Sequence, residues 1–450
     1  MECAAERRSI RADSIWYDLW MRRFTNWAGT VVTVPSEWIV PEHEDALQDV
    51  VKRTIQRRGR IKVVGAAHSF SPIAAPVDVA LSLHNICGIV SHDASKSEVV
   101  VRAGTRLKDL NAALAARGLA LPIVGSIAEQ AIAGAISTAT HGSSLVHGNL
   151  ASLVTAVQLV DGKGDLLDIP SGDPRLPGAR VHLGALGVLT SITLRVVPAF
   201  RLAEEIEQIP ISEAIRNLEA IAHSAEYVKV WWIPRTQETQ VYRYHRTDEP
   251  ESTWPHPETL RFIDNKIGQD RLFPLFAAIQ KQFPRSIPTI NRWLAKTLLR
   301  PRLVGTSSLM LSTVMPARHR ETEAAVPLSL ASDAVSRVVH MIEKESYGAN
   351  FPLELRFVRG DDNWMSPAQG RDTCQIGAYT TQMHDTDAFF SSFWRTLKPL
   401  SPRPHFGKEH AYTVDDVRPL YPHVERFLAL RDEIDPQRVF CSPHLRRLLG

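Results

Sequence analysis

A histidine stands at the end of a turn made of small residues, where it could act on a bound cofactor. The stretch VVGAAHSFSP, residues 63–72, runs from β-branched residues through Gly65, Ala66 and Ala67 to His68 and Ser69. Small residues after a strand let successive backbone N–H groups converge on one point, and such a concavity binds phosphate oxygens. We therefore expect a nucleotide cofactor here. The alternative is a plain turn with a solvated imidazole.

Two further runs of small residues strengthen this interpretation. GSIAEQAIAGAISTATHGSS (125–144) contains Gly134 and Gly142, and LGALGVLTS (183–191) contains Gly184 and Gly187. Glycine allows a backbone to approach a ligand closely, and the Ser and Thr hydroxyls can donate hydrogen bonds. The chain has neither GxGxxG nor GxxxxGK[ST], so the common dinucleotide and P-loop sites are unsupported. Three such loops suggest an extended ligand laid across one domain.

Charged residues alternate with apolar residues in FPLELRFVR, residues 351–359. A strand here turns Leu353, Leu355 and Phe357 to a core and places Glu354 and Arg356 together on the other face. From this spacing alone, a solvated salt bridge is the simpler interpretation.

Six motifs occur in an order that resembles the vanillyl-alcohol-oxidase superfamily of PCMH-type FAD enzymes. They are GAAHS, IAGAISTATHG, HLGALGVLTSITL, LELRF, GRDTC and RPHFGK, and the resemblance runs from about residue 24 to the C-terminus. The sequence is most similar to the sugar-1,4-lactone oxidases (L-gulonolactone and D-arabinono-1,4-lactone oxidases) and to the alditol oxidases. The resemblance implies an α+β fold with two domains, a PCMH-type FAD-binding domain and an α+β cap domain that binds substrate.

The resemblance also implies the residues of the FAD site. His68 would be bonded covalently to the flavin methyl group at C8, while the amides of the 65–69 turn hold the pyrophosphate. His141 is expected to be a structural part of its loop rather than a catalyst, and no metal is expected. The residues expected to bind FAD are Gly65, Ala66, Ala67, His68, Ser69, Gly125, Ser126, Ala131, Gly134, Thr138, Ala139, Thr140, His141 and Leu189.

The implied reaction transfers a hydride from a carbinol carbon to flavin N5, with loss of the hydroxyl proton. Glu354 and Arg356 would bind substrate hydroxyls, with Ser126 and Tyr379 as further substrate contacts. Lys408 in RPHFGK would stabilise negative charge on the reduced ring. The catalytic base stays open. Alditol oxidases have a histidine and a threonine where this chain has Gly377 and Tyr379, which favours a lactone over an alditol such as xylitol or sorbitol.

Gly125 bears on the electron acceptor. In the family, alanine just before the matched Ser126 blocks dioxygen in some members and glycine opens a path. We therefore expect an oxidase that produces hydrogen peroxide, and a dehydrogenase with a cytochrome or quinone acceptor is the alternative. Gly125 could also serve only to permit an unusual backbone angle.

Three positions depart from the family pattern. Ala67 stands where relatives usually have glycine, so the loop around the pyrophosphate could sit differently. Phe406 stands where tryptophan is usual and would preserve an aromatic wall. Ser442 replaces a common asparagine, and the sequence gives no reason for it.

These residues need an α+β framework to position them. Apolar spacing and terminal glycines predict helices in PEHEDALQDVVKRTIQRRG (41–59) and TRLKDLNAALAARG (105–118). VTAVQLVDGKGDLLDI (154–169) reads as two strands joined by a turn, and LTSITLRVVP (189–198) as another strand. We expect a leader over 1–23, an FAD-binding domain over 24–200 and a cap domain over 201–400. The segment 401–450 would pack back to complete the FAD and active site.

Composition excludes several classes of protein. The 450 residues are 44% hydrophobic with a net charge of +3 and no long basic block, which argues against disorder and nucleic-acid binding. The four cysteines are far apart, so a zinc ribbon or a disulfide scaffold is disfavoured and a reducing, cytoplasmic location is expected. The leader lacks the apolar core of a signal peptide, and no apolar run reaches the ~18 residues of a membrane span.

A basic amphipathic segment over 272–302 could touch a membrane surface. Pro284 and Pro288 interrupt it, so we expect a half-solvated pair of helices without membrane contact. Two rival functions stay open. A flavin reductase or nicotinamide-linked enzyme on a related fold would need a nicotinamide site, for which no feature is visible. The presence of Glu354, Arg356 and Lys408 together argues against a non-catalytic carbohydrate-binding protein.

Overall fold

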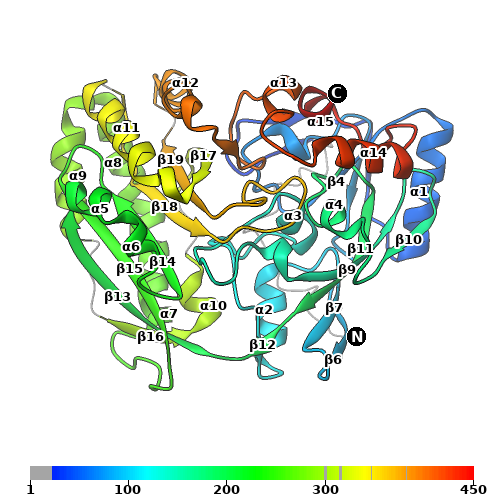
Figure 1. Ribbon diagram of the computed structural model, residues 1–450, viewed down its shortest axis with the longest axis horizontal. Helices are drawn as coiled ribbons and strands as arrows, with labels where there is room; N and C mark the ends of the chain where they lie inside the picture. The colour runs from blue at the N-terminus through cyan, green and yellow to red at the C-terminus, as the bar shows by residue number, and fades with distance from the viewer. Residues whose placement is uncertain (1–22, 298–301, 314–316, 346, 382) are drawn as a thin grey trace.

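Two lobes lie side by side in the computed structural model, which describes residues 23–297, 302–313, 317–345, 347–381 and 383–450 (Figure 1). One lobe holds the N-terminal part of the chain and the C-terminal helices. The other is built around a large sheet formed mainly after residue 200. Helices and strands are mixed in both lobes, which confirms the predicted α+β class.

The first lobe contains a small parallel sheet and a larger antiparallel one. The parallel sheet has the order β3 (Glu37–Ile39), β5 (Val79–Ser82), β4 (Ile61–Val64). The antiparallel sheet has the order β10 (Leu166–Ile169), β9 (Val154–Val160), β11 (Val188–Arg195), β7 (Glu98–Arg102), β6 (Ile89–Asp93). Two short pairs join β1 (Phe24–Thr25) to β2 (Val32–Thr33) and β8 (Leu119–Ala120) to β12 (Val197–Pro198).

The helices of this lobe form where the apolar spacing predicts them. Helices α1 (Glu44–Gln56) and α2 (Leu107–Ala115) bury their apolar stripes and leave the other face exposed. The predicted hairpin is β9 and β10, and Gly164 in its turn has a φ of +84°, a conformation that glycine adopts without strain. Shorter helices are η1 (Pro72–Ala74), α3 (Ile132–Ser137), η2 (Leu150–Leu153) and α4 (Leu176–Arg180).

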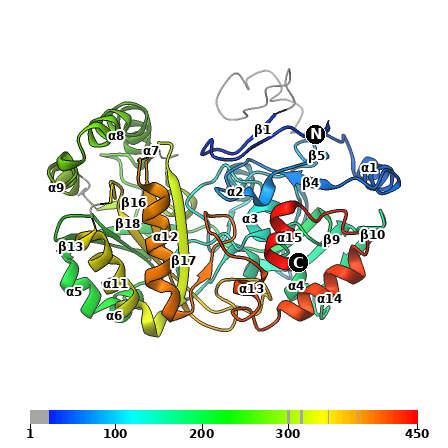
Figure 2. The same ribbon diagram turned by 90° about the horizontal axis from the view of Figure 1, so that it is seen from above.

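An eight-stranded antiparallel sheet forms the second lobe. Its order is β16 (Leu303–Thr306), β13 (Arg201–Pro210), β15 (Glu238–Thr247), β14 (Tyr227–Trp232), β18 (Leu353–Val358), β19 (Thr373–Thr380), β17 (Arg320–Pro327), β20 (Arg403–Pro404). Helices α5 (Ile211–Arg216), α6 (Leu218–Ala222), α11 (Ala331–Lys344) and α12 (Thr386–Leu397) cover one face (Figure 2). The short η5 (Leu328–Leu330) and η6 (Lys398–Leu400) adjoin α11 and α12.

The two faces of this sheet differ in chemistry because side chains alternate along each strand. Leu353, Leu355 and Phe357 of β18 belong to the core beneath α11 and α12. The side chains between them, Glu354 and Arg356, face the opposite side. This alternation is the one that LELRF predicts.

The C-terminal segment returns to the first lobe. Helices α13 (Val414–Val417), α14 (Val424–Ile434) and α15 (Pro443–Leu449) lie against it (Figure 1). The Ile61 N–H at the start of β4 donates to the Val439 oxygen at 2.9 Å, and the Phe70 N–H donates to the Gly407 oxygen at 2.7 Å. Residues more than 300 positions apart in the sequence therefore build one site together.

A group of helices precedes β17 in the second lobe. It comprises α7 (Pro257–Ile263), the π-helical η3 (Asp264–Leu272), α8 (Phe273–Gln282), η4 (Pro284–Ser286), α9 (Ile287–Thr297) and α10 (Ser307–Leu311). Pro284 begins η4 and Pro288 lies in the first turn of α9, positions where proline costs no hydrogen bond. The segment is thus a pair of helices, as expected. Within the described ranges, no helix is both long and apolar enough to cross a membrane.

Candidate active site

A cleft opens in the first lobe where the turn after β4 meets α3 and the start of β11. Its volume is about 1090 Å³, counting the part that is open to solvent. Predicted cofactor residues that line it are Gly65, Ala66, Ala67, His68, Ser69, Ala131, Gly134, Thr138 and Leu189. The other predicted residues, Gly125, Ser126, Ala139, Thr140 and His141, are not part of this lining.

The 65–69 turn offers its backbone to the cleft. Ala67 has a φ of 55°, the left-handed conformation that costs an L-residue roughly 1–2 kcal/mol and glycine nothing. This explains why glycine is expected there. The backbone N–H groups of residues 66–69 donate no hydrogen bond to any other described residue, so they are available to a ligand.

His68 is uncharged at neutral pH. Burial lowers its pKa to about 4; the nearby Glu129 raises it, and the charges of Arg106 and Lys408 lower it. One ring nitrogen therefore keeps a free lone pair beside the cleft.

Sequence reasoning missed two polar residues that line the cleft. Lys62 is buried, which lowers its pKa to about 8, and its ammonium group donates to the Leu183 oxygen at 3.3 Å. His182 shares a hydrogen bond of 2.9 Å between Nε2 and the Ser137 hydroxyl, while its buried Nδ1 has no partner among the described residues. The signal that could have revealed Lys62 is the presence of a lysine inside the apolar run IKVV.

Position 125 needs glycine because a side chain would not fit there, and not because the backbone adopts a conformation that only glycine tolerates. Its φ lies outside the left-handed region, so the interpretation as an unusual backbone angle is wrong. An added Cβ would lie 2.6 Å from Cγ2 of Thr140. The neighbouring Ser126 accepts a 2.9 Å hydrogen bond at its backbone oxygen from the Thr313 N–H, which ties this loop to the second lobe.

Glu354 and Arg356 form a buried pair on the polar face of the large sheet. The side-chain accessibility of Glu354 is 7%, so the pair is not a solvated salt bridge. One carboxylate oxygen accepts from Arg356 and from the Tyr379 hydroxyl at 2.6 Å, and the other accepts from Trp231 Nε1 at 2.9 Å.

Glu354 stays ionised. Burial raises its pKa, but the charge and hydrogen bond of Arg356, the charge of Lys229 and the hydrogen bond of Tyr379 outweigh this and bring the pKa to about 2. Glu354 is thus a hydrogen-bond acceptor at neutral pH and cannot donate a proton.

Gly377 and Tyr379 act as a pair. A Cβ on Gly377 would lie 2.9 Å from the Tyr379 hydroxyl and about 3 Å from the ring, so the phenol occupies the space that Gly377 leaves empty. The antiparallel register places Gly377 between Glu354 and Glu323. The departure from the alditol-oxidase pattern therefore changes which polar group stands beside Glu354.

Lys408 pairs with a carboxylate that sequence reasoning missed. Its ammonium group contacts the Glu321 carboxylate and lies 4.8 Å from the centre of the Phe70 ring. Burial raises the pKa of Glu321, but the charge of Lys408, with a smaller effect of the neighbouring His319, outweighs burial, so the pKa lies below its usual value and the group stays ionised. The Glu321 backbone oxygen also accepts from the Glu409 N–H at 3.0 Å, so β17 fixes the loop that carries Lys408.

His319 stands at the centre of an aromatic group next to this ion pair. Its ring centre lies 5.1–5.5 Å from the ring centres of Trp27, Phe70, Phe351 and Tyr379. His319 Nδ1 donates to the Ala317 oxygen at 2.8 Å, which leaves Nε2 free 3.8 Å from the Glu321 carboxylate. The motif ARHRE gave no sign of this position.

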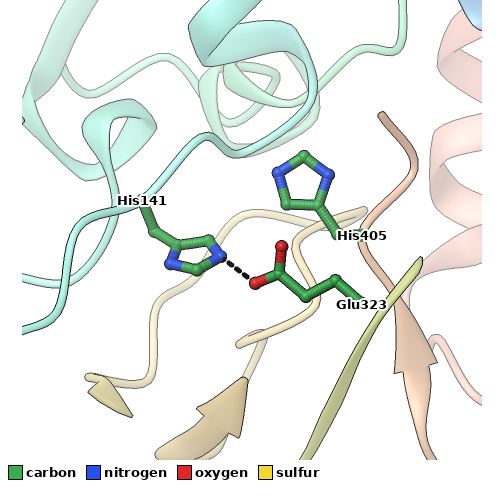
Figure 3. Close-up of side chains that lie close together, drawn as sticks. All are labelled: His141, Glu323 and His405. Carbon is green, nitrogen blue, oxygen red and sulfur yellow. Dashed lines mark ion pairs between the residues drawn. The ribbon is translucent and has the colours of Figure 1, made fainter. Parts of the chain in front are cut away.

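His141 and His405 lie on either side of the Glu323 carboxylate (Figure 3). His141 Nε2 lies 2.8 Å from the carboxylate, and its Nδ1 donates to the Gly142 oxygen at 2.8 Å. His405 Nδ1 accepts from the Gly407 N–H at 3.1 Å, so its proton sits on Nε2.

The ligand atoms of this cluster are near enough to hold a metal ion, being within 4.8 Å of one another. The protonated Nε2 of His405 has no lone pair with which to bind a metal ion, however. The hydrogen bonds therefore favour a buried hydrogen-bonded cluster of His141, Glu323 and His405 over a metal site. The expectation that His141 is structural fits this contact and stays a prediction.

Two further departures have a physical account. Phe406 is fully buried against Tyr421 and His410, with ring centres at 5.4 and 5.9 Å, and belongs to the hydrophobic core. Ser442 precedes α15 and its hydroxyl accepts from the Leu445 N–H at 3.3 Å. Serine and asparagine are about equally good N-caps, which explains the replacement.

The cleft suits FAD in its chemistry. The free N–H groups of the 66–69 turn can bind a pyrophosphate, and the α-carbon of Gly134 faces open space, since an added Cβ would meet nothing within 4 Å. His182 lines the cleft, and its buried Nδ1, which has no partner among the described residues, is an atom that a ligand can satisfy.

Comparisons with known proteins agree with this site. An FAD-binding domain model matches residues 35–170, and the D-arabinono-1,4-lactone oxidase model matches residues 192–448. The chain is 31% identical to an L-gulono-1,4-lactone dehydrogenase of Mycobacterium tuberculosis, over 95% of this chain and 99% of that protein. It is 29% identical to an L-gulonolactone oxidase of Scyliorhinus torazame, over 94% and 98% of the two chains.

The fold is also that of a solved oxidase. Cholesterol oxidase from Brevibacterium sterolicum superposes with a TM-score of 0.81 at 16% identity, over 95% of this chain and 97% of that one. FAD is therefore the cofactor. The chain belongs to the D-arabinono-1,4-lactone oxidase family of FAD-dependent oxidoreductases.

Proposed function

We propose that the protein oxidises a sugar 1,4-lactone, of the L-gulono or D-arabinono type, at a carbinol carbon, and that dioxygen is the electron acceptor, with hydrogen peroxide as product. The observation that carries the substrate proposal is the buried group of Glu354, Arg356 and Tyr379 on the polar face of the large sheet. The two relatives named above act on L-gulonolactone according to their names, which also favours a lactone substrate.

The chain's own residues would bind and orient the sugar. Ionised Glu354 accepts hydrogen bonds from substrate hydroxyls, Arg356 donates them, and the Tyr379 oxygen, whose proton goes to Glu354, can accept one. Ser126, whose loop is tied to Thr313, adds a contact from the first lobe. Holding the reacting carbon about 3–3.5 Å from its acceptor atom is the main contribution of such a site.

FAD supplies the hydride acceptor when it is bound. We propose that His68 tethers it covalently, which the neutral imidazole beside the cleft supports. Lys408, fixed by Glu321, would place a positive charge where negative charge develops on reduction.

The domain division belongs to the same proposal. We place the FAD-binding domain at 24–200, the cap at 201–400 and the completing segment at 401–450; the leader expected at 1–23 lies, but for its last residue, outside the described residues. The large sheet begins with β13 at Arg201, and the contacts of Gly407 and Val439 with the first lobe support the assignment of the last segment.

Anaerobic single-turnover mixing tests the substrate. Flavin bleaching is followed with L-gulono-1,4-lactone, D-arabinono-1,4-lactone and xylitol, and the lactones should reduce the flavin faster. Glu354→Gln should slow reduction by both lactones, whereas the control Glu226→Gln, an Arg-paired glutamate at another part of the sheet, should not. Faster reduction by xylitol would favour an alditol oxidase, and no reduction by any of the three would refute the proposal.

A further inference from the structure

Helix α8 has its polar and apolar residues reversed for a helix at a protein surface, and α9 buries one amide beside its apolar residues. Gln280 is the buried residue of α8, whereas Leu275 and Ile279 on the same helix are exposed. In α9, Asn291 is buried and Trp293 is half exposed. A helix that packs on a core in water normally does the reverse.

Polar hydrogen bonds fasten this pair to the second lobe. Gln280 donates to the Asn291 side chain at 3.2 Å and accepts from Asn350 at 3.1 Å. Asn291 donates to the Pro234 oxygen at 2.9 Å. The attachment leaves the apolar side chains free to face outward.

Within the described part of the second lobe, most of the large exposed hydrophobic side chains lie in the segment 254–293, which includes α8 and the first part of α9. Exposure reaches 87% for Trp254, 64% for Phe262 and 62% for Phe283, values that leave nearly the whole side chain outside the core. We call this set the apolar face. Its members are Trp254, Phe262, Ile263, Ile267, Leu272, Leu275, Ile279, Phe283 and Trp293.

The charges on α8 and α9 have one sign, although the preceding α7 and η3 carry the exposed acids Glu258 and Asp270. Residues 273–297 include Lys281, Arg285, Arg292 and Lys296 and contain no aspartate or glutamate, in a chain whose totals of 52 basic and 49 acidic residues are nearly balanced. All four basic residues are exposed. Figure 2 shows α8 and α9 together at the outer edge of the second lobe, away from the helices of the first.

We propose that the apolar face docks on the surface of an anionic lipid bilayer. Exposed aromatic and aliphatic side chains enter the headgroup region, and lysine and arginine beside them are attracted to anionic lipids. A second copy of the chain is a poorer occupant, because a symmetric contact would bring the four cations of one copy against the same four of the other. The proposal differs from the expectation of no membrane contact, and it is independent of the substrate.

The docking face adjoins the candidate active site. Phe273 at the start of α8 lies 4.5 Å, ring centre to ring centre, from Phe351, and Phe351 lies 6.2 Å from Tyr379. Docking would therefore place the sheet side that carries Tyr379 near the membrane surface.

Sedimentation of the purified holoenzyme with vesicles tests this proposal. Vesicles of phosphatidylcholine alone are compared with vesicles that also contain phosphatidylglycerol. The protein should bind the anionic vesicles at least about tenfold more tightly, and the preference should weaken at high salt. No binding to the anionic vesicles would overturn the proposal.

Two variants separate the contributions. Leu275→Ser with Phe283→Ser removes apolar side chains, and Lys281→Glu with Arg285→Glu reverses charge; each should weaken binding roughly tenfold or more. The matched controls are Val34→Ser with Val90→Ser, exposed valines of the first lobe, and Lys163→Glu. Unchanged flavin absorbance and lactone-driven reduction in every variant show that the fold and the proposed activity are intact.

Two results would contradict the assignment. Variants of the apolar face that bind vesicles like the wild type would show that another surface is responsible. A dimer in sedimentation velocity that Phe283→Ser dissociates would show that a second copy covers the face instead.

Discussion

Substituting Gly125 tests the choice of electron acceptor, but the structure shows that the simple variant has two effects. In Gly125→Ala the new methyl group would lie 2.6 Å from Cγ2 of Thr140, against a normal carbon contact of about 3.5–4.0 Å. The Thr140 backbone cannot retreat easily, because its N–H donates to the Ala135 oxygen and its oxygen accepts from the Leu150 N–H, both at 2.9 Å. Overpacking of this kind costs about 1–3 kcal/mol.

The double variant Gly125→Ala with Thr140→Ser separates the methyl group from the clash. Serine removes Cγ2 and keeps the hydroxyl, so the double variant should recover the urea midpoint of Thr140→Ser alone. If the methyl group itself obstructs dioxygen, both Gly125→Ala and the double variant should slow stopped-flow reoxidation by at least about tenfold, a barrier increase of about 1.4 kcal/mol. Flavin reduction by substrate should change little.

Two outcomes refute the reasoning. Reoxidation at the wild-type rate in the double variant would mean that Gly125→Ala acted by displacing Thr140. Wild-type flavin that reacts with dioxygen as slowly as in a dehydrogenase would reject the oxidase assignment while leaving the FAD site intact.

Three other predictions concern charged and nucleophilic groups. His68→Ala should leave FAD in the supernatant after acid precipitation, and flavin still in the pellet would show that another residue is the tether. Lys408→Met should slow single-turnover flavin reduction on the order of 10²-fold. The control is Arg337→Met, which removes an exposed ion pair with Asp333 on α11. An unchanged rate in Lys408→Met would mean that the contact of Lys408 with Glu321 is only structural. For Lys62, burial lowers the folded pKa to about 8, below its unfolded value, so the apoprotein gains stability as pH rises from about 8 to 10.5. Lys62→Met apoprotein should therefore be more stable at pH 7, by up to about 3 kcal/mol, with the difference vanishing near pH 10.5 in urea titrations; a less stable variant would contradict this.

Patterns within single segments of the sequence predicted the strand faces and the loops of the site. The alternation in LELRF placed Glu354 and Arg356 together on one face because a strand has a period of two residues. The three small-residue loops indicated the cleft, since each loop's conformational freedom is a property of its own residues.

The remaining contacts of the site could not be predicted, because they join residues that are far apart in the sequence. RETEAAVP carries Glu321 and Glu323 with the same alternation, yet their partners Lys408 and His141 lie 87 and 182 positions away. Trp231 reaches Glu354 only because β14 pairs with β18. Contacts of this kind depend on strand order, which no single-sequence period reveals.

The hydrogen bonds from Ile61 to Val439 and from Phe70 to Gly407 also constrain when the cofactor can enter. A nascent chain emerges N-terminus first, so β4 and the turn that bears His68 are made long before the segment that closes over them. The residues that line the cleft, within 62–189, are all made before residues 407 and 439, so until then the cleft lacks the backbone contacts that fix β4 and the turn. Firm flavin binding is thus expected to follow chain completion, and a ribosome-bound chain stalled at residue 400 should hold FAD more weakly than the finished chain.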